Sequence, residues 1–447
     1  MRRLNPRPTY DEFRQQCLIP NEPCIISNGN NGASHSPLAS STGLAAAFVH
    51  HWPAYDTWLT SNKHEIDYDN LTRLLGDVTV SPVTQQPGTS DCNDREINFG
   101  DLLDQWRNGL AQNVYLKDWH LPLMLSKRTT ISQEGIRLKG EQVVQDLLYK
   151  VPNIVRDDWM NEYYGQETED DFRFVYAGGG DTVTLLHRDV YASYSVSTNI
   201  FGRKRWYMFP PQCTPHLQPY ISAARYNSQG VDVRTWSQNT LAQFHQLGML
   251  VVEQEQAETI FGKFRALPSG WYHQVVNLTH PTISLNHNWC NAHNILSMYK
   301  SMSQEVEDCR DAISDVKQML ARNATAVGKH KGSETDWRFE WETCVQDLVR
   351  QNAGWDWKTF WSMIKFALRR MIDPDEWQAT DRWPMVEPSL RPPPAFVLSQ
   401  VEPCLKDFCA RPEEEHRFVA GLNEILQDVS TMVNDLRLAS DNNSLRT

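Results

Sequence analysis

The sequence predicts an α+β protein whose centre is a double-stranded β-helix, or jelly roll. Two observations carry this prediction. Between Phe172 and Trp289, short runs rich in β-branched and aromatic residues follow one another closely, separated by Gly and Pro. After Ser297, apolar residues recur with a helical period to the end of the chain. The chain therefore divides into an N-terminal mixed α/β region at 1–170, the β-helix core at 171–296 and a C-terminal helical region at 297–447.

Length and composition exclude several classes of protein. The chain has 447 residues, and because 40% of them are hydrophobic it can bury a sizeable core rather than remain disordered. No apolar run approaches the ~20 residues of a membrane-spanning helix. A net charge of −12 repels nucleic acid and anionic membrane surfaces. We therefore expect a globular protein that binds neither a membrane nor nucleic acid directly.

The nine cysteines are odd in number and include no Cys-x-x-Cys pair. They indicate neither a disulfide framework nor a structural zinc site, and reduced thiols fit best. The first residues carry no apolar stretch typical of a secretory signal. We expect a cytoplasmic location, with the nucleus as the other compartment that these features allow.

In the N-terminal region, helical patterns alternate with short apolar runs. The apolar positions of the expected helices are Trp58, Leu71, Leu74 and Leu75, with a further helix at 99–106. Two polar insertions at 28–42 and 81–96 are rich in Ser, Asn, Gly and Pro. Such composition predicts surface loops.

The core region is expected to contain about eight strands. They are predicted at 172–176, 182–186, 194–200, 205–209, 250–253, 258–261, 274–277 and 282–286. Eight antiparallel strands close into a barrel whose interior is wide enough for one small ligand.

The helical region contains three amphipathic patterns. Their apolar positions are Val306, Cys309, Ile313, Val316 and Leu320, then Trp357, Phe360, Trp361, Ile364, Leu368 and Met371, then Leu422, Ile425, Val429, Met432 and Leu436. The last set repeats every seven residues for just over two heptads, short of the ~3–4 typical of a coiled coil. A helix packed on its own barrel is therefore favoured over a homodimer seam, and both interpretations stay open.

The strongest chemical signal is His187-Arg188-Asp189, directly after the strand expected at 182–186. His-x-Asp places both side chains on one side of an extended chain. Two histidines and one carboxylate supply the three ligands that Fe(II) oxygenases use. The motif alone is weak, since 14 histidines and 55 acidic residues in 447 predict nearly two matches by chance. A candidate third ligand, His273, begins a strand 86 residues downstream, although a single histidine is more often a core residue.

Further polar residues lie where a buried strand is expected. Lys204 is flanked by aromatic residues, and an inward-facing cation there needs an anionic partner. Asn286, His287 and Asn288 interrupt the last apolar strand. Lys204 could instead extend to the surface, and the asparagines could cap an edge strand. Taken together, these residues indicate a dicarboxylate that chelates the metal and is anchored by Lys204.

The segments 172–211 and 268–291 resemble the JmjC family of Fe(II)- and 2-oxoglutarate-dependent oxygenases. The motifs Tyr-Leu-Lys-Asp-Trp-His at 115–120, Asp-Trp-Met-Asn-Glu at 158–162, Gly-Arg-Lys-Arg-Trp at 202–206 and Asn-His-Asn-Trp at 286–289 look like a protein hydroxylase group within it. The resemblance runs from about residue 10 to 295 and implies a cupin-like barrel. It does not reach the helical tail.

The resemblance implies roles for individual residues. His187, Asp189 and His273 match the iron ligands, with Fe(II) as metal and 2-oxoglutarate and O2 as cosubstrates. The positions that match cosubstrate-binding residues are Lys204, Thr184, Tyr115, Asn286 and Ser195. Lys204 matches the lysine that binds the distal carboxylate of 2-oxoglutarate, whereas Ser195 stands where several relatives carry asparagine. Aspartate as second ligand favours the hydroxylase branch over histone demethylases.

By the same resemblance, the reaction is hydroxylation of a protein, with a lysine of the translation termination factor release factor 1 as the leading substrate. A second hypothesis is N-methyl-lysine demethylation, in which the hydroxylation falls on a methyl carbon. A third is a non-catalytic cupin-type binding protein, with Trp355, Trp357 and Trp361 as a partner surface, although their helical spacing is more typical of a core.

One departure from the family pattern concerns the third ligand. Residues 262–267 intervene between Phe261 and Pro268, where relatives run almost directly from strand to turn. A longer loop there could displace His273 and leave a metal-poor protein.

Overall fold

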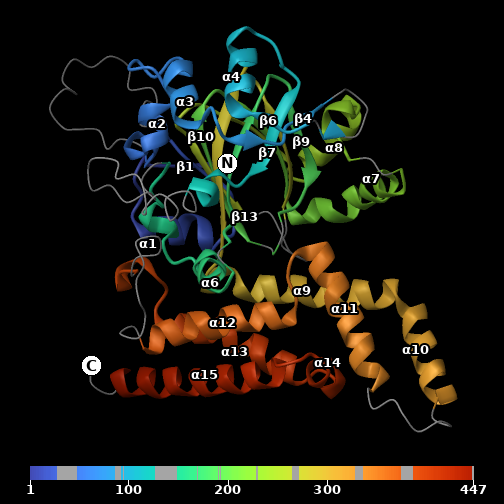
Figure 1. Cartoon of the computed structure of the whole chain (residues 1–447). Helices are drawn as coiled ribbons and strands as arrows, with labels where there is room; N and C mark the ends of the chain where they lie inside the picture. The colour runs from blue at the N-terminus through green and yellow to red at the C-terminus, as the bar shows by residue number, and fades with distance from the viewer. Residues whose placement is uncertain are drawn as a thin grey trace.

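Two sheets, each antiparallel in its central strands, face each other at the centre of the computed structural model (Figure 1). One sheet has the strand order β12-β11-β14-β9, with β9 at Val183–His187, β11 at Lys204–Phe209, β12 at Leu250–Gln254 and β14 at Tyr272–Asn277. The facing strands of the second sheet have the order β13-β10-β15-β8, with β8 at Arg173–Gly178, β10 at Tyr194–Phe201, β13 at Thr259–Lys263 and β15 at Thr282–Trp289. This arrangement confirms the predicted double-stranded β-helix, and each predicted strand overlaps one of these eight.

The structure describes residues 1–27, 48–85, 92–93, 95–125, 148–168, 170–189, 191, 193–227, 230–263, 271–327, 336–373 and 386–444. The predicted loop at 28–42 lies outside them. Within these ranges, no helix combines the length and apolar character needed to cross a membrane.

The second sheet continues beyond the barrel at both edges. On one side are β2 (Cys24–Ile26) and β1 (Arg2–Leu4), and on the other β7 (Val114–Trp119), β4 (Val83–Thr84) and β5 (Cys92–Asn93). The prediction of a plain surface loop at 81–96 is therefore wrong, because β4 pairs with both β5 and β7. A separate pair joins β3 (Thr79–Val80) to β6 (Ile97–Asn98). Strands of two residues carry almost no local signal, and only tertiary pairing stabilises them.

Short helices cover the outer face of the extended sheet. They are α1 (Tyr10–Phe13), which continues into a π-helical turn at Arg14–Leu18, α2 (Pro53–Thr57), α3 (Tyr68–Leu75), α4 (Phe99–Arg107) and α6 (Trp159–Glu167). Leu71 and Leu75 are buried as predicted, whereas Leu74 is 38% exposed. Trp58 is buried directly after the end of α2. The apolar faces of α3 and α4 share one core with the outer side of β8 and β15.

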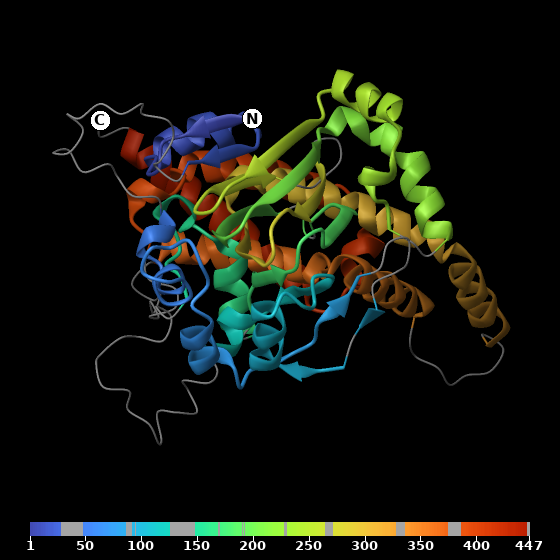
Figure 2. The same cartoon turned by 90° about the horizontal axis from the view of Figure 1, so that it is seen from above.

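Two helices that the sequence analysis did not predict connect β11 to β12. They are α7 (Thr214–Tyr226) and α8 (Gln238–Gln246), and they lie at the side of the barrel (Figures 1 and 2). An apolar cluster joins these helices to β11 and β14, and it includes Phe209, Leu217, Phe244 and Tyr272. Short 3-10 turns occur at Phe48–His51, Asn153–Val155, Pro211–Cys213, Val233–Thr235 and Pro388–Leu390.

The C-terminal helices form layers beneath the barrel. They are α9 (Ala292–Ala312), α10 (Ser314–Val327), α11 (Trp337–Ala353), α12 (Trp357–Ile372), α13 (Pro394–Cys409), α14 (Glu413–Arg417) and α15 (Leu422–Ser444). Figures 1 and 2 both show α10 projecting away from the body. The predicted run at 306–320 is divided between α9 and α10, because α9 ends at Ala312 and Ile313 is its C-cap. The prediction for the last helix also differs from the structure. We expected it to pack on the barrel, whereas α15 packs on α12 and α13.

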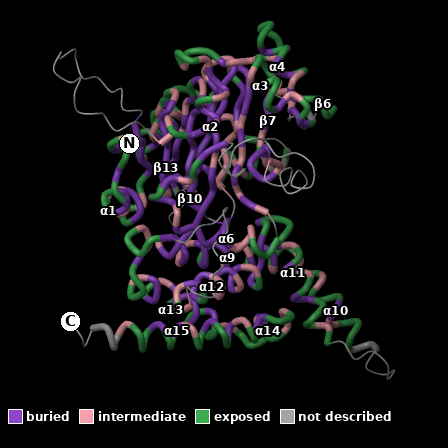
Figure 3. The backbone as a smooth tube through the Cα atoms, turned by 60° about the vertical axis from the view of Figure 1, so that its left-hand side comes forward, coloured by how far each residue is buried: buried purple, intermediate pink, exposed green. Residues whose placement is uncertain are grey.

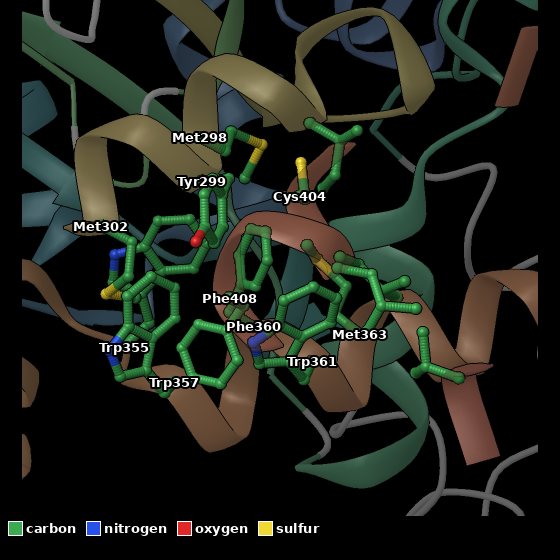
Figure 4. Close-up of a cluster of buried hydrophobic side chains, with 14 of the residues drawn as sticks. Met298, Tyr299, Met302, Trp355, Trp357, Phe360, Trp361, Met363, Cys404 and Phe408 are labelled. Atoms are coloured by element: carbon green, nitrogen blue, oxygen red, sulfur yellow. The ribbon is translucent and has the colours of Figure 1, made fainter. Parts of the chain in front are cut away.

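A large apolar cluster joins α9, α10, α11, α12, α13 and α15 to one another and to α6. Figure 3 shows buried stretches of α6, α9 and α12 in this part of the molecule. Figure 4 shows its aromatic centre, where side chains of α9, α12 and α13 converge. Trp355, Trp357 and Trp361 are at most 2% exposed. They are therefore core residues, as their helical spacing favoured.

Candidate metal and cosubstrate site

The barrel brings together the three residues expected to bind a metal. His187 ends β9, Asp189 follows two residues later, and His273 lies on β14 directly opposite His187 in the strand pairing. One ligand atom from each residue lies within 4.8 Å of the other two. Asp189 Oδ1 is 3.8 Å from His187 Nε2 and 4.0 Å from His273 Nε2. The longer connection before Pro268 therefore does not displace His273, although residues 264–270 lie outside the described ranges.

Hydrogen bonding and packing fix how the two imidazoles are presented. His187 Nδ1 is 2.8 Å from the carbonyl oxygen of Leu185, so Nδ1 is the donor in this hydrogen bond and Nε2 is the ring nitrogen on the side of Asp189. Trp206 stacks on His273 at 5.6 Å between ring centroids. Burial, and then the nearby His187, hold the pKa of His273 well below its usual range. His273 is therefore neutral, which is the form that binds metals.

This donor set fits Fe(II). Two imidazole nitrogens and one carboxylate oxygen on the same side of an ion leave coordination positions open for cosubstrate and oxidant. Among the residues that the structure describes, no other group of three His, Cys, Asp or Glu side chains has this proximity. The side chain of His187 is 36% exposed and that of His273 only 4%, so the site opens to solvent on the His187 side.

Lys204, at the start of β11, supplies a buried cation in the same barrel. Its side chain is 2% exposed, which excludes an extended surface conformation. Its Nζ donates to Ser284 Oγ at 2.5 Å and lies 5.6 Å from the centroid of the Tyr176 ring. Burial lowers the pKa of Lys204 from 10.5 to about 7. Because no described acidic side chain offsets this burial, the barrel interior favours an anionic ligand.

The other expected cosubstrate residues line the same interior. Tyr115 Oη and Thr184 Oγ1 are 3.1 Å apart, which joins β7 to β9. Asn286 Oδ1 accepts hydrogen bonds from Ser197 Oγ at 2.8 Å and from Ser284 Oγ at 3.3 Å. Asn286 is thus linked to Lys204 through Ser284.

Ser195 is buried on β10, two residues before Ser197, and strand alternation places both on the same face. In the pairing of β10 with β15, Ser195 lies opposite Asn288, whereas Ser197 lies opposite Asn286. Three residues near Lys204 and Asn286 were not predicted from the sequence, namely Ser284, Ser197 and Tyr176. Ser284 had a usable signal, because it lies two residues before Asn286 and must share its face of β15.

His287 points to the opposite side of β15 and belongs to a buried network. Its Nε2 is 2.8 Å from Asp158 Oδ2, and its Nδ1 is 3.2 Å from Tyr149 Oη. Asp158 caps α6 by accepting from the backbone N–H of Asn161 at 3.1 Å. The polar run at 286–288 therefore divides by strand alternation between the barrel interior and the α6 interface.

At the rim of the barrel, the Tyr176 hydroxyl donates to the carboxylate of Asp118. Asp118 is exposed and has a φ of 48°, at a point where the pairing of β7 with β8 shifts register. Bulges of this kind redirect side chains at barrel rims. The Asp118 carboxylate therefore lies at the hydroxyl edge of the Tyr176 ring, whose face is next to Lys204 Nζ.

Comparison with known proteins gives a consistent result. A family model described as a cupin-like domain matches residues 44–295. The protein named "2-oxoglutarate and iron-dependent oxygenase JMJD4" from Danio rerio is 30% identical over 386 residues, which cover 81% of this chain and 73% of the relative. Its namesake from Mus musculus is 29% identical with the same coverage. "Arginine-specific demethylase JMJ20" from Arabidopsis thaliana is 29% identical over 71% of this chain and 64% of the relative.

Proposed function

This chain belongs to the cupin-like JmjC family of the JMJD4 oxygenases, and from that premise we propose that it is an Fe(II)- and 2-oxoglutarate-dependent protein hydroxylase. One observation carries the proposal. A buried lysine cation and a group of two histidines and one aspartate lie in the same small barrel. That combination suits a diacid that chelates a metal at one end and binds an ammonium group at the other.

Each side chain has a defined task in this proposal. His187, Asp189 and His273 hold the metal, and the buried position of His273 keeps it neutral. Lys204 binds the distal carboxylate of 2-oxoglutarate, and the Tyr115–Thr184 pair donates to the same group. With 2-oxoglutarate and O2, bound iron supplies the oxidising power to hydroxylate a C–H bond. The barrel walls exclude water around these groups.

The substrate we propose is a lysine side chain of release factor 1. This assignment rests on the family resemblance and on aspartate as second ligand. Electrostatics also support it, since a chain with a net charge of −12 favours a basic segment of a partner. Asp118, which is exposed and accepts a hydrogen bond from Tyr176, adds a negative charge that can attract a cationic side chain.

N-methyl-lysine demethylation is the second candidate. A relative from Arabidopsis thaliana is named an arginine-specific demethylase, which supports demethylation as the reaction type but not lysine as the residue. The same site would then hydroxylate a methyl carbon on nitrogen, and the product would release formaldehyde. A non-catalytic binding protein is the third candidate, and it should neither bind iron nor release succinate.

The test incubates the purified chain with Fe(II), 2-oxoglutarate, O2 and release factor 1. We expect succinate release and a single peptide heavier by one oxygen atom, located by mass mapping. His187→Ala should abolish both while the far-UV circular dichroism stays unchanged. Formaldehyde without the heavier peptide would favour demethylation. An active His187→Ala variant with full iron occupancy would refute the ligand assignment.

A further inference from the structure

Tyr191 connects the loop that carries Asp189 to the C-terminal helices. It lies two residues beyond Asp189, so the two Cα atoms are at most about 7 Å apart. The tyrosine is 5% exposed, and its hydroxyl donates to the carbonyl oxygen of Gly354 at 2.7 Å. Its ring packs edge-on against the rings of Trp355 and Phe172, with centroid distances of 4.9 Å and 5.0 Å respectively. A residue next to the proposed metal site is thus buried in the core of another region.

The backbone of Tyr191 requires this support. Its φ is 61°, a left-handed conformation that is unfavourable for a bulky side chain. Such a conformation persists only where the surroundings determine it, and it is concentrated at functional sites. The hydrogen bond to Gly354 holds it here, together with aromatic packing against Trp355, Phe172 and Tyr164.

Gly354 is shaped to receive the tyrosine. It ends α11 with a φ of 80°, and a Cβ atom at this position would lie 2.4 Å from Tyr191 Oη. The turn to α12 is itself fixed, because Asp356 caps α12 through the N–H of Thr359 at 2.7 Å and pairs with Arg350. A rigid turn of the helical region therefore provides the contact surface.

We propose that Tyr191 is a positioning residue that fastens the Asp189 loop to the α11–α12 turn, so that the C-terminal helices set the affinity of the site for its metal. This inference rests on the proposed role of Asp189 as a ligand. It assigns a task to helices that lie beyond residue 295, where the match to the cupin-like domain ends.

The test measures metal affinity by titrating the full-length chain with Co(II), which is stable in air and reports binding through its visible absorption. Tyr191→Phe keeps the ring and removes only the hydroxyl. We expect its Kd for Co(II) to rise about tenfold, the lower end of what supporting groups around a metal usually contribute. The matched control is Tyr299→Phe, which removes a bond to Asp407 of 2.6 Å in the same apolar cluster. The control should lower Tm comparably and leave the Kd unchanged.

A second pair of variants tests the contact from the other side. Gly354→Ala should push Tyr191 away and weaken Co(II) binding further than Tyr191→Phe does. Gly421→Ala is its control, since Gly421 has a φ of 78° but an added Cβ would come no closer than 3.6 Å to Lys358. Equal Co(II) affinity in Tyr191→Phe and the unaltered chain would overturn the inference. Absence of Co(II) binding by the unaltered chain would instead overturn the proposed function and this inference with it.

Discussion

Lys204 combines a cost in folding stability with the role in binding 2-oxoglutarate that we propose for it. An unfolded lysine takes up a proton near pH 10.5, whereas Lys204 in the folded chain does so only near pH 7. Between these values the unfolded state binds more protons, so the free energy of unfolding decreases as the pH falls from 10 to 7 and is constant in this respect below 7. A ligand carboxylate would restore the charged form.

We therefore predict that Lys204→Met weakens 2-oxoglutarate binding by at least about 100-fold while leaving the ligand-free protein equally or more stable at pH 7. Urea unfolding at pH 7 and pH 9 provides the measurement. The unaltered chain should lose more stability than the variant between pH 9 and pH 7. A variant that is less stable than the unaltered chain at pH 7 would show that the lysine has an anionic partner within the protein.

Tyr115 is the uncharged residue that we propose to bind the same carboxylate of 2-oxoglutarate as Lys204. Because hydrogen bonds to charged groups contribute about 1.5–3 kcal/mol, Tyr115→Phe should raise the Kd for 2-oxoglutarate at least about tenfold. Tyr149→Phe is the comparison, since its hydroxyl bonds to His287 on the outer side of β15. Calorimetric titration of both variants separates the two positions. Equal effects would mean that Tyr115 acts through the stability of the barrel.

At the scale of single helices and strands, the sequence predicted what has a strong repeating pattern. The barrel strands were predictable because β-branched and aromatic residues are bounded by Gly and Pro. The pair β4 and β5 was not, since two-residue strands depend on partners far along the chain. The apolar pattern at 306–320 continues through Ile313, although this side chain packs at the junction between α9 and α10. Periodicity reports which face is apolar and not where a helix bends.

The contact between α12 and α6 contains a buried charge cluster. Arg370 lies 3.0 Å from Asp157 and also pairs with Glu162, and all three side chains are at most 5% exposed. Removal of one partner from such a cluster leaves uncompensated buried charge. We predict that Arg370→Leu lowers the free energy of unfolding by about 3–5 kcal/mol, measured by urea denaturation.

Lys365→Leu is the control on the same helix. Lys365 pairs with Asp428 between side chains that are 34% and 49% exposed, so its replacement should change stability by about 1 kcal/mol or less. Similar losses in the two variants would mean that the loss from Arg370 is one of general helix packing rather than of buried charge.

For the whole molecule, the barrel and the C-terminal helices share contacts at Tyr191, Arg370 and α9. We therefore predict one cooperative unfolding transition. Co(II) at about 100 times its Kd should stabilise the folded state by about 2.7 kcal/mol, and the shift should appear in circular dichroism at 222 nm, which is dominated by helices distant from the metal. His187→Ala should show no shift. If Co(II) leaves the unfolding transition at 222 nm unchanged, the barrel and the C-terminal helices unfold independently.

The same scale explains which parts of the site were predictable. His187 and Asp189 form a local motif, whereas His273 and Lys204 were candidates from their place in expected buried strands, to which the family resemblance then gave roles. Their supporting contacts were not predictable, because Tyr191 and Gly354 are 163 positions apart and neither carries a local pattern. Ser284 lies between these extremes, since strand alternation identifies its face but not its partner.

The pairing of β14 with β9 and β11 has a consequence for how such enzymes diversify. Because these ladders set the position of His273, the connector before Trp271 can change in length without changing the coordination sphere. The length of this connector can therefore differ between homologues that keep the same three ligands in the same place.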